Sequence, residues 1–267
     1  MSKAIDILII DDEQVVRDAV SRICAAIGLS VEAAADARVG LEKIQKNKYR
    51  LIVCDVMLPE LNAFQILEEM KRARVTTPLI MITGYSTTEN AVNSLKFGAV
   101  DFIPKPFTAD ELESTLQRGL RRQKFARAAF PKDSKAGENA PFHVSCPSDY
   151  FRLGFLSWAL IEENGVGRVG ITDLFLKTTC DVKAIMLFEL NDNLVQGSVC
   201  ARIESNDSLI HDVLSPLSGR IIERNDGLQS HPQTLEKDPY FTGWLYLMIP
   251  TDVAYELKHL TPCTQQT

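Results

Sequence analysis

Polar side chains stand at the ends of several apolar runs in the first half of the chain. Asp11 and Asp12 follow one run, Asp55 ends another, and Thr83 and Lys105 follow two later runs. Three carboxylates brought together repel one another unless a hard cation such as Mg²⁺ neutralises them. An ammonium and a hydroxyl beside that cation would stabilise a phosphoryl group during its transfer. These residue types therefore predict phosphoryl transfer to a carboxylate, with Asp55 as the central candidate acceptor.

Parallel strands would bring these side chains together, because their carboxyl ends meet at one edge of a sheet. Apolar runs alternate with segments whose apolar residues recur at helical spacing, which predicts five strand-helix units in a doubly wound parallel α/β sheet. Ser86 to Glu89 and Thr108 to Glu111 have the spacing of capping boxes. Strands are expected at residues 5–10, 30–34, 50–54, 78–82 and 100–103, and helices at 12–27, 36–46, 62–73, 86–97 and 108–124.

Each of these polar residues also has an ordinary structural explanation. Asp11 or Asp12 alone could cap the first helix, Thr83 could be a buried hydroxyl with a partner, and Lys105 could be a solvated charge. The position of all five at strand ends favours the chemical interpretation.

The pattern resembles the receiver domain of bacterial two-component response regulators over residues 5–123. The resemblance rests on an acidic pair, an aspartate with Pro59 four residues later, a Thr-Gly pair at Thr83 and a Lys-Pro pair at Lys105, in family order. It implies a flavodoxin-like receiver fold and a cis peptide bond before Pro106.

The resemblance implies a role for each matching residue. Asp11 and Asp12 would be the acidic pair that holds Mg²⁺, and Asp55 would contact the metal and accept the phosphoryl group from a sensor histidine kinase. Met57 would offer its backbone carbonyl to the metal. Tyr85 and Met57 would flank the site and limit the access of water, which would lengthen the life of the phosphorylated state.

Three further residues would respond to the phosphoryl group. Thr83 would hydrogen-bond one of its oxygens, Lys105 would contact it, and Phe102 would be the aromatic switch that turns inward as Thr83 draws back. The family usually has glycine where this chain has Ala63, which implies a modest turn penalty and no loss of chemistry.

The composition predicts two ordinary domains in the cytoplasm. The chain has 267 residues and 45% hydrophobic content, and no segment approaches the ~18 apolar residues that span a bilayer. Its start leads into a strand rather than a signal peptide. Because the cysteines include no Cys-x-x-Cys pair, all are expected to be reduced structural thiols. They are Cys24, Cys54, Cys146, Cys180, Cys200 and Cys263.

Charge divides the chain into a receiver domain at 1–125, a flexible linker at 126–145 and a second domain at 146–267. The first is neutral and the last carries a net charge of −7. A DNA-binding output is disfavoured, because phosphate neutralisation needs a basic surface. The basic run that closes the last receiver helix is interpreted as a solvated face; it comprises Arg118, Arg121, Arg122, Lys124 and Arg127.

The second domain has the short strands and turns of a mostly-β fold. Strands are expected at residues 156–162, 167–171, 184–190, 199–204, 219–224 and 245–249, with short helices near 173–177, 232–237 and 252–260. His211 and His231 have acids nearby, but histidines on a polar hairpin are expected to be solvated rather than to bind a metal.

Four phrases in this region resemble the glycine-cleavage H protein, a lipoyl carrier with a barrel-sandwich hybrid fold. The phrases begin at Trp158, Arg168, Leu214 and Asp238 and read WALIEE, RVGITD, LSPLSG and DPYFTGWL. That family presents a lipoyl lysine on a hairpin, and counting from its flanking motifs places the position at Asp207 or Ser208. No lysine occurs anywhere from residue 184 to 236. No lipoate is expected, because attachment needs a primary amine.

The sequence therefore predicts a response regulator of a phosphorelay rather than an enzyme. Phosphorylation would alter the surface of the fourth and fifth receiver helices, which would then pair with another receiver as a homodimer or release the output domain. The output domain would bind an unknown protein partner, and no nucleic acid or membrane partner is expected. The alternative is a carrier mimic or a component of a lipoyl or glycine-cleavage enzyme system.

Overall fold

The computed structural model describes residues 5–84, 87–129 and 143–264, and the chain divides into two compact units. One unit comprises residues 1–86 and 97–141, and the other comprises residues 87–96 and 142–267. The capping box predicted at Ser86 and most of the predicted linker lie outside the described residues. No helix in the described part of the chain is long and apolar enough to cross a membrane.

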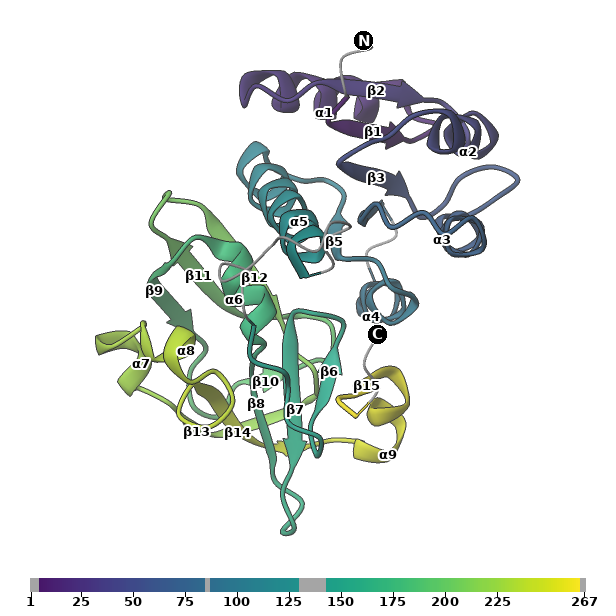
Figure 1. Ribbon diagram of the computed structural model, residues 1–267. Helices are drawn as coiled ribbons and strands as arrows, with labels where there is room; N and C mark the ends of the chain where they lie inside the picture. The colour runs from purple at the N-terminus through teal and green to yellow at the C-terminus, as the bar shows by residue number, and fades with distance from the viewer. Residues whose placement is uncertain (1–4, 85–86, 130–142, 265–267) are drawn as a thin grey trace. The chain divides into compact units, whose positions relative to one another are not determined.

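The first unit contains a five-stranded parallel sheet, as the alternation of elements predicts, and its strand order is β2-β1-β3-β4-β5 (Figure 1). The strands are β1 (Ile7–Ile10), β2 (Val31–Ala34), β3 (Leu51–Asp55), β4 (Leu79–Thr83) and β5 (Asp101–Pro104). The helices between and after them are α1 (Gln14–Ala26), α2 (Ala37–Lys46), α3 (Ala63–Arg72), α4 (Thr88–Phe97) and α5 (Ala109–Ala129). By its packing, α4 groups with the second unit except for its last residue.

Both faces of this sheet are buried, which is why its strands are apolar at every position rather than at alternate ones. Ile9 and Val53 pack with residues of α1 and α5 on one face, whereas Leu8 and Ile52 pack with residues of α2 and α3 on the other. Helices on both faces leave the carboxyl edge of the strands as the place where polar side chains can gather.

Local hydrogen bonds explain where two helices begin. The Glu111 carboxylate accepts from the Thr108 N–H, and the Glu111 N–H donates to the Thr108 hydroxyl, so the capping box predicted there is confirmed. Asn62 and Gln65 form a second capping box at the start of α3, which sequence inspection missed. Helix α5 continues to Ala129, five residues beyond its predicted end at 124.

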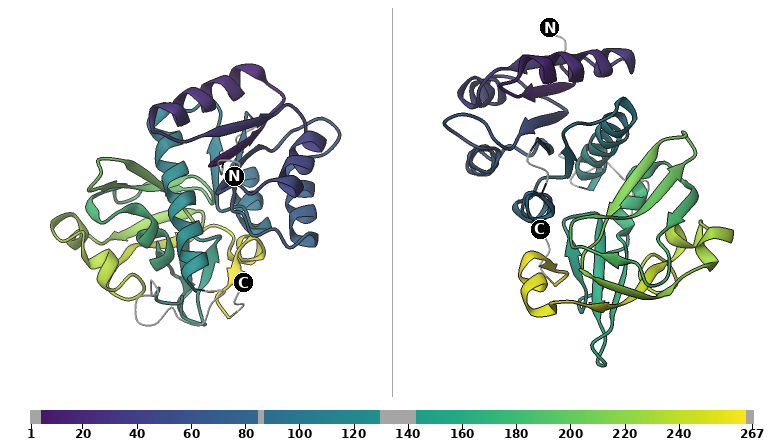
Figure 2. Two further views of the ribbon diagram at one scale, coloured as in Figure 1. Left: turned by 45° about the horizontal axis from the view of Figure 1, so that its top comes forward. Right: turned by 180° about the vertical axis from the view of Figure 1, so that it is seen from behind.

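The second unit is mostly β, with one seven-stranded sheet and one three-stranded sheet around a shared apolar core (Figures 1 and 2). The seven-stranded sheet contains β6 (Phe151–Leu153), β7 (Ser157–Ile161), β8 (Gly167–Ile171), β10 (Asn193–Leu194), β13 (Gly219–Arg224), β14 (Trp244–Pro250) and β15 (Thr261–Pro262). The three-stranded sheet has the order β12-β11-β9 and contains β9 (Val182–Leu187), β11 (Val199–Ser205) and β12 (Ile210–Leu214).

All six strands predicted in this region are present, and four further strands were missed. The missed strands are β6, β10, β12 and β15, of which three have two or three residues and show too little alternation to be recognised. Short helices lie where they were expected, at α6 (Asp173–Thr179), α8 (Thr234–Lys237), α9 (Val253–Glu256) and the 3₁₀ turn η1 (Leu257–His259). A further helix of one turn, α7 (Gly227–Ser230), was missed.

A buried indole fixes one corner of the second unit. The Trp158 side chain is fully buried on β7, and its Nε1–H lies within hydrogen-bonding distance of the carbonyls of Ile171 (3.0 Å) and Pro239 (3.1 Å). Gly170, opposite Trp158 on β8, makes room for the ring, because a Cβ there would stand 2.3 Å from a ring carbon. Only glycine fits this position.

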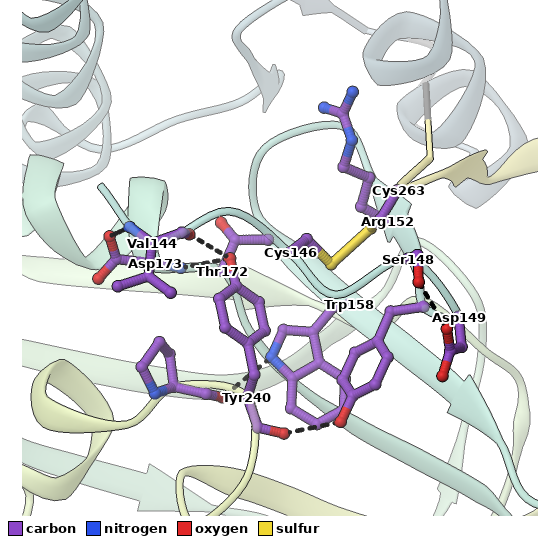
Figure 3. Close-up of a disulfide and its surroundings, with 12 residues drawn as sticks. Val144, Cys146, Ser148, Asp149, Arg152, Trp158, Thr172, Asp173, Tyr240 and Cys263 are labelled. Carbon is purple, nitrogen blue, oxygen red and sulfur yellow. Dashed lines mark hydrogen bonds between the residues drawn. A yellow bond between two sulfur atoms is a disulfide. The ribbon is translucent and has the colours of Figure 1, made fainter. Parts of the chain in front are cut away.

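Cys146 and Cys263 form a disulfide, with their Cα atoms 5.7 Å apart (Figure 3). The prediction that all cysteines are reduced is therefore wrong for this pair. The two residues are separated by 117 positions, and sequence spacing alone gives no sign that the fold brings the ends of the domain together. Cys24, Cys54, Cys180 and Cys200 are free thiols, as expected.

Replacing Gly170 with alanine should destabilise the second unit by on the order of 2–3 kcal/mol, because the added methyl group overlaps the Trp158 ring. Urea unfolding followed by tryptophan fluorescence measures this. Both tryptophans of the chain, Trp158 and Trp244, lie in the second unit, so the signal reports that unit alone.

The matched control is Gly227→Ala, where the nearest atom is the Asn225 side-chain oxygen at 3.4 Å and no steric overlap results. Its unfolding midpoint should stay close to that of the wild type. Equal midpoints for the two variants would show that the indole does not need the space at Gly170.

Candidate functional site

The predicted acidic and basic residues meet at the carboxyl edge of the five-stranded sheet. Asp11 follows β1, Asp55 ends β3 and Lys105 follows β5. The Lys105 ammonium lies 2.8 Å from Asp11 Oδ2 and 3.2 Å from Asp55 Oδ2. It also lies 2.9 Å from an oxygen of Glu13, a residue that sequence inspection did not single out. The one sequence feature that could have pointed to Glu13 is its position directly after the acidic pair Asp11 and Asp12.

Burial and charge oppose each other in this cluster. The Asp11 side chain is fully buried, and burial raises its pKa, although the neighbouring Lys105 ammonium works against that shift. Burial alone would lower the pKa of Lys105, but the carboxylates of Asp11, Glu13 and Asp55 outweigh it and the net shift is upward. Lys105 is therefore a permanent cation that offsets part of the negative charge.

The carboxylates fit a small oxygen-liganded cation. One oxygen atom from each of Asp11, Asp12 and Asp55 can be chosen so that all three lie within 4.8 Å of one another. Asp11 Oδ2 is buried, and the Lys105 ammonium lies 2.8 Å from it. Three carboxylates beside one ammonium leave net negative charge, and an all-oxygen set of this kind matches the preference of Mg²⁺.

The remaining predicted residues surround this cluster. The Met57 N–H donates to Asp55 Oδ1 at 3.3 Å, and the Met57 side chain is exposed. Thr83 is buried at the end of β4, and its carbonyl accepts from the Lys105 N–H at 2.7 Å. Phe102 is half-buried on β5 and packs against the α2 and α3 side of the core. Tyr85 lies outside the described residues. Metal binding by the Met57 carbonyl and movement of Phe102 stay predictions.

Two predictions about residues near the site have opposite outcomes. The peptide bond between Lys105 and Pro106 is cis, as predicted. Arg118, predicted to be part of a solvated basic face, is buried and donates through Nε and Nη2 to Asp101 Oδ2 at 2.9 and 2.6 Å. The interpretation of Arg118 as a surface charge is therefore wrong, because the α5 face that carries it packs against β5.

The second unit presents the β11–β12 hairpin where the lipoyl lysine was sought. Asn206, Asp207 and Ser208 are exposed at its tip. His211, predicted to be solvated, is fully buried, and its Nε2 lies 3.0 Å from the buried Ser205 hydroxyl. The prediction for His211 is wrong because it faces the interior of the hairpin. Within the described ranges, Asp11, Asp12 and Asp55 form the one cluster of this kind that could hold a metal.

Comparisons with known families match both units. The model of the response regulator receiver domain matches residues 7–117, and that of the glycine cleavage H-protein matches residues 152–266. The chain therefore contains a receiver domain followed by a domain of the H-protein family. Together with the parallel sheet of the first unit and the two sheets of the second, this confirms the predicted fold classes.

Curated relatives match the receiver half. The transcriptional regulatory protein DltR of Streptococcus agalactiae is 37% identical over 46% of this chain and 54% of its own length. The response regulator protein TodT of Pseudomonas putida is 33% identical over 50% of this chain and 59% of its own length. The chain thus spans little more than half the length of these relatives.

Solved structures match each half. A glycine cleavage system H protein from Mycobacterium marinum is 30% identical over 45% of this chain and 94% of its own, with a TM-score of 0.40. A response regulator receiver domain protein from Methanospirillum hungatei JF-1 is 34% identical over 46% of this chain and 98% of its own, with a TM-score of 0.43.

Replacing Lys105 with methionine should lower the free energy of unfolding of the first unit by on the order of 3 kcal/mol near neutral pH, because buried carboxylates lose their cation. A buried carboxyl whose folded pKa is raised stabilises the fold at low pH and loses this contribution as pH rises. The deficit should therefore shrink toward acid pH and on addition of Mg²⁺. Urea unfolding followed by far-UV circular dichroism measures it.

Lys46→Met is the control, since Lys46 exposes 71% of its side chain. It should change stability by no more than about 0.5 kcal/mol at any pH. A Lys105→Met deficit that responded neither to pH nor to Mg²⁺ would mean that Lys105 acts through packing rather than charge.

Proposed function

We propose that this protein is a response regulator of a phosphorelay that accepts a phosphoryl group on Asp55. The observation that carries the proposal is the position of Asp55 at the end of β3, nearly buried, with Lys105 Nζ 3.2 Å from one of its oxygens and Asp11 and Asp12 beside it. The receiver family of residues 7–117 supports it. The curated relatives DltR and TodT are described as a transcriptional regulatory protein and a response regulator, which supports the class of response regulators.

The reaction that suits this geometry is displacement at phosphorus. An Asp55 carboxylate oxygen attacks the phosphorus of the donor, a bond from oxygen to phosphorus forms, and the bond to the donor's leaving group breaks. Asp11, Asp12 and Asp55 would hold Mg²⁺, with the Met57 carbonyl as a further ligand, and the bound ion would neutralise charge on the transferred oxygens.

The chain's own groups orient the phosphoryl group and shield it. The Lys105 ammonium is already within reach of Asp55 and can turn toward the added oxygens. The Thr83 hydroxyl stands at the end of the neighbouring strand, where it would donate a hydrogen bond to a phosphoryl oxygen. Because Asp55 and Thr83 are buried, water has little access to the acyl phosphate, which favours a persistent modified state.

A sensor histidine kinase is the partner that would supply the phosphoryl group. The added charge would draw Thr83 and then Phe102 inward and change the surface of α4 and α5. Two outcomes fit a receiver: pairing with another receiver as a homodimer, or release of the output domain. Neither outcome requires nucleic acid. The net charge of −7 over residues 146–267 disfavours nucleic-acid binding by the second domain.

The second domain would act as a protein-binding module without lipoate. Its hairpin tip is exposed as in a carrier, but Asp207 and Ser208 stand at the counted lysine position. No primary amine occurs between residues 184 and 236. Since the hairpin itself is intact, a second candidate function is mimicry: the domain would dock on an enzyme of lipoyl or glycine metabolism and regulate it.

Asp55→Asn should abolish phosphate uptake, because the amide oxygen cannot form the acyl phosphate. Intact-mass measurement after incubation with Mg²⁺ and a small acyl phosphate should give one phosphoryl adduct on the wild type and none on the variant. Asp36→Asn is the matched control, since Asn can keep the N-cap of α2 that Asp36 provides, and it should retain the adduct.

Uptake that persisted in Asp55→Asn would move the acceptor to Asp11 or Asp12. No adduct on the wild type, from the small donor or from a cognate kinase, would make the first domain a receiver that is not phosphorylated. A change in elution volume of the phosphorylated wild type on a sizing column would identify pairing as the output.

Co-expression with a lipoate ligase should leave the mass of the wild-type chain unchanged, because the hairpin offers no amine. A lysine-bearing H protein in the same cells provides the positive control. A lipoyl adduct on this chain would overturn the assignment of the second domain as a non-lipoylated module, and peptide mapping would locate the modified lysine.

A further inference from the structure

The segment of residues 143–146, here called the strap, enters the second domain and is fastened to it at three points. The Val144 N–H donates to Asp173 Oδ2 at 2.7 Å, and the Val144 carbonyl accepts from the Tyr240 hydroxyl at 3.2 Å. The third point is the disulfide from Cys146 to Cys263 (Figure 3). Beyond the strap, Tyr150 begins the regular hydrogen bonding of the domain.

The two hydrogen bonds of the strap are made by the buried polar side chains of Asp173 and Tyr240, whose burial costs free energy. Asp173 is buried, and its second oxygen, Oδ1, has no hydrogen-bond partner among the described residues. Burial raises the pKa of Tyr240 to about 12, so its hydroxyl stays protonated and can donate. If the strap moved away, water would hydrate the Asp173 carboxylate, and this hydration opposes the hydrogen bond from Val144. The disulfide is not weakened in this way.

The disulfide joins the two ends of the domain. Cys263 follows Pro262 at the end of β15, and its N–H donates to the Tyr150 carbonyl at 2.9 Å. Both cysteines are half-buried rather than fully buried, as attack by a dissolved thiol requires. They flank the aromatic cluster of Tyr150, Trp158 and Tyr240.

The other cysteines do not compete for this chemistry. Burial raises the pKa of Cys24 and of Cys200 to about 12, and Cys54 is shifted upward for the same reason, so these thiols stay protonated and unreactive. Cys180 is exposed and has no cysteine partner among the described residues. Formation of a disulfide within the chain is therefore confined to Cys146 and Cys263.

We propose that Cys146 and Cys263 form a reversible thiol–disulfide modification site that fastens or releases the strap. Reversibility rests on the proposed function, because a receiver is phosphorylated in a compartment whose thiol pools keep cysteines reduced. A thiolate of a dithiol reductant attacks one sulfur, the bond between Cys146 and Cys263 breaks, and a mixed disulfide forms.

The second thiolate of the reductant then closes its own disulfide and releases the chain. Two electrons and two protons pass to the cysteine pair, and the reductant is oxidised. Closure is the reverse, with a low-molecular-weight disulfide as the oxidant. The reduced form holds the strap by the two hydrogen bonds alone. The expected effect of reduction is therefore release of the strap from the second domain.

Hydrogen exchange of the full chain, followed by mass spectrometry, tests this site. The peptide covering residues 143–150 should exchange about tenfold faster or more after treatment with a dithiol than after oxidised glutathione, because the Val144 amide loses its protection. A peptide covering β7 should exchange equally in both states. Alkylation in a Cys180→Ser background should add two groups only after reduction.

Cys146→Ser with Cys263→Ser should give fast exchange of the strap under both treatments, and Cys180→Ser should keep the difference. Equal exchange in both states despite full reduction would show that the disulfide does not hold the strap. Failure of the pair to close with oxidised glutathione would remove the site altogether.

This test separates the two proposals. Asp55→Asn should respond to the dithiol as the wild type does, since the sulfur chemistry needs no phosphoryl group. Loss of phosphorylation with an intact redox response would overturn the proposed function alone. Phosphorylation with no redox response would overturn the disulfide site alone.

Discussion

Mutual repulsion among carboxylates at one edge of the parallel sheet is the constraint on which the first domain depends. Asp11 and Asp55 are buried there, where water screens their charges poorly, and Lys105 is the one cation among the described residues that reaches both. The strand order places these residues together, and the burial of both sheet faces fixes the strands. Lys105 balances this negative charge only in part, which agrees with the cation and the phosphoryl group that we propose for the cluster.

The grouping of the candidate site residues was predictable because these residues follow strands. Apolar runs that stop at Asp55, Thr83 and Lys105 define both the strands and the polar edge of the sheet, so one pattern predicts the fold and the positions of the candidate residues. Glu13 was missed because it belongs to neither the strand nor the family motif. Its ion pair with Lys105 depends on how the chain turns into α1, which no spacing rule specifies.

The remaining errors share a physical cause, which is contact between residues far apart in the sequence. Arg118 looked like a surface charge until β5 supplied Asp101, and His211 looked solvated until the hairpin enclosed it. The pairing of Cys146 with Cys263 needs the domain to close on itself over 117 residues. Periodicity describes which face of an element is apolar, but it cannot name the partner across the core.

The length of α5 has a mechanical consequence. The helix runs for 21 residues and ends at Ala129, twelve positions after the receiver family match stops at 117. At ~1.5 Å per residue, the last part of the helix extends ~18 Å past that point. Residues 118–129 are thus a continuation of the helix, and any tilt of α5 about its first turn would displace Ala129 farther than the residues near 117.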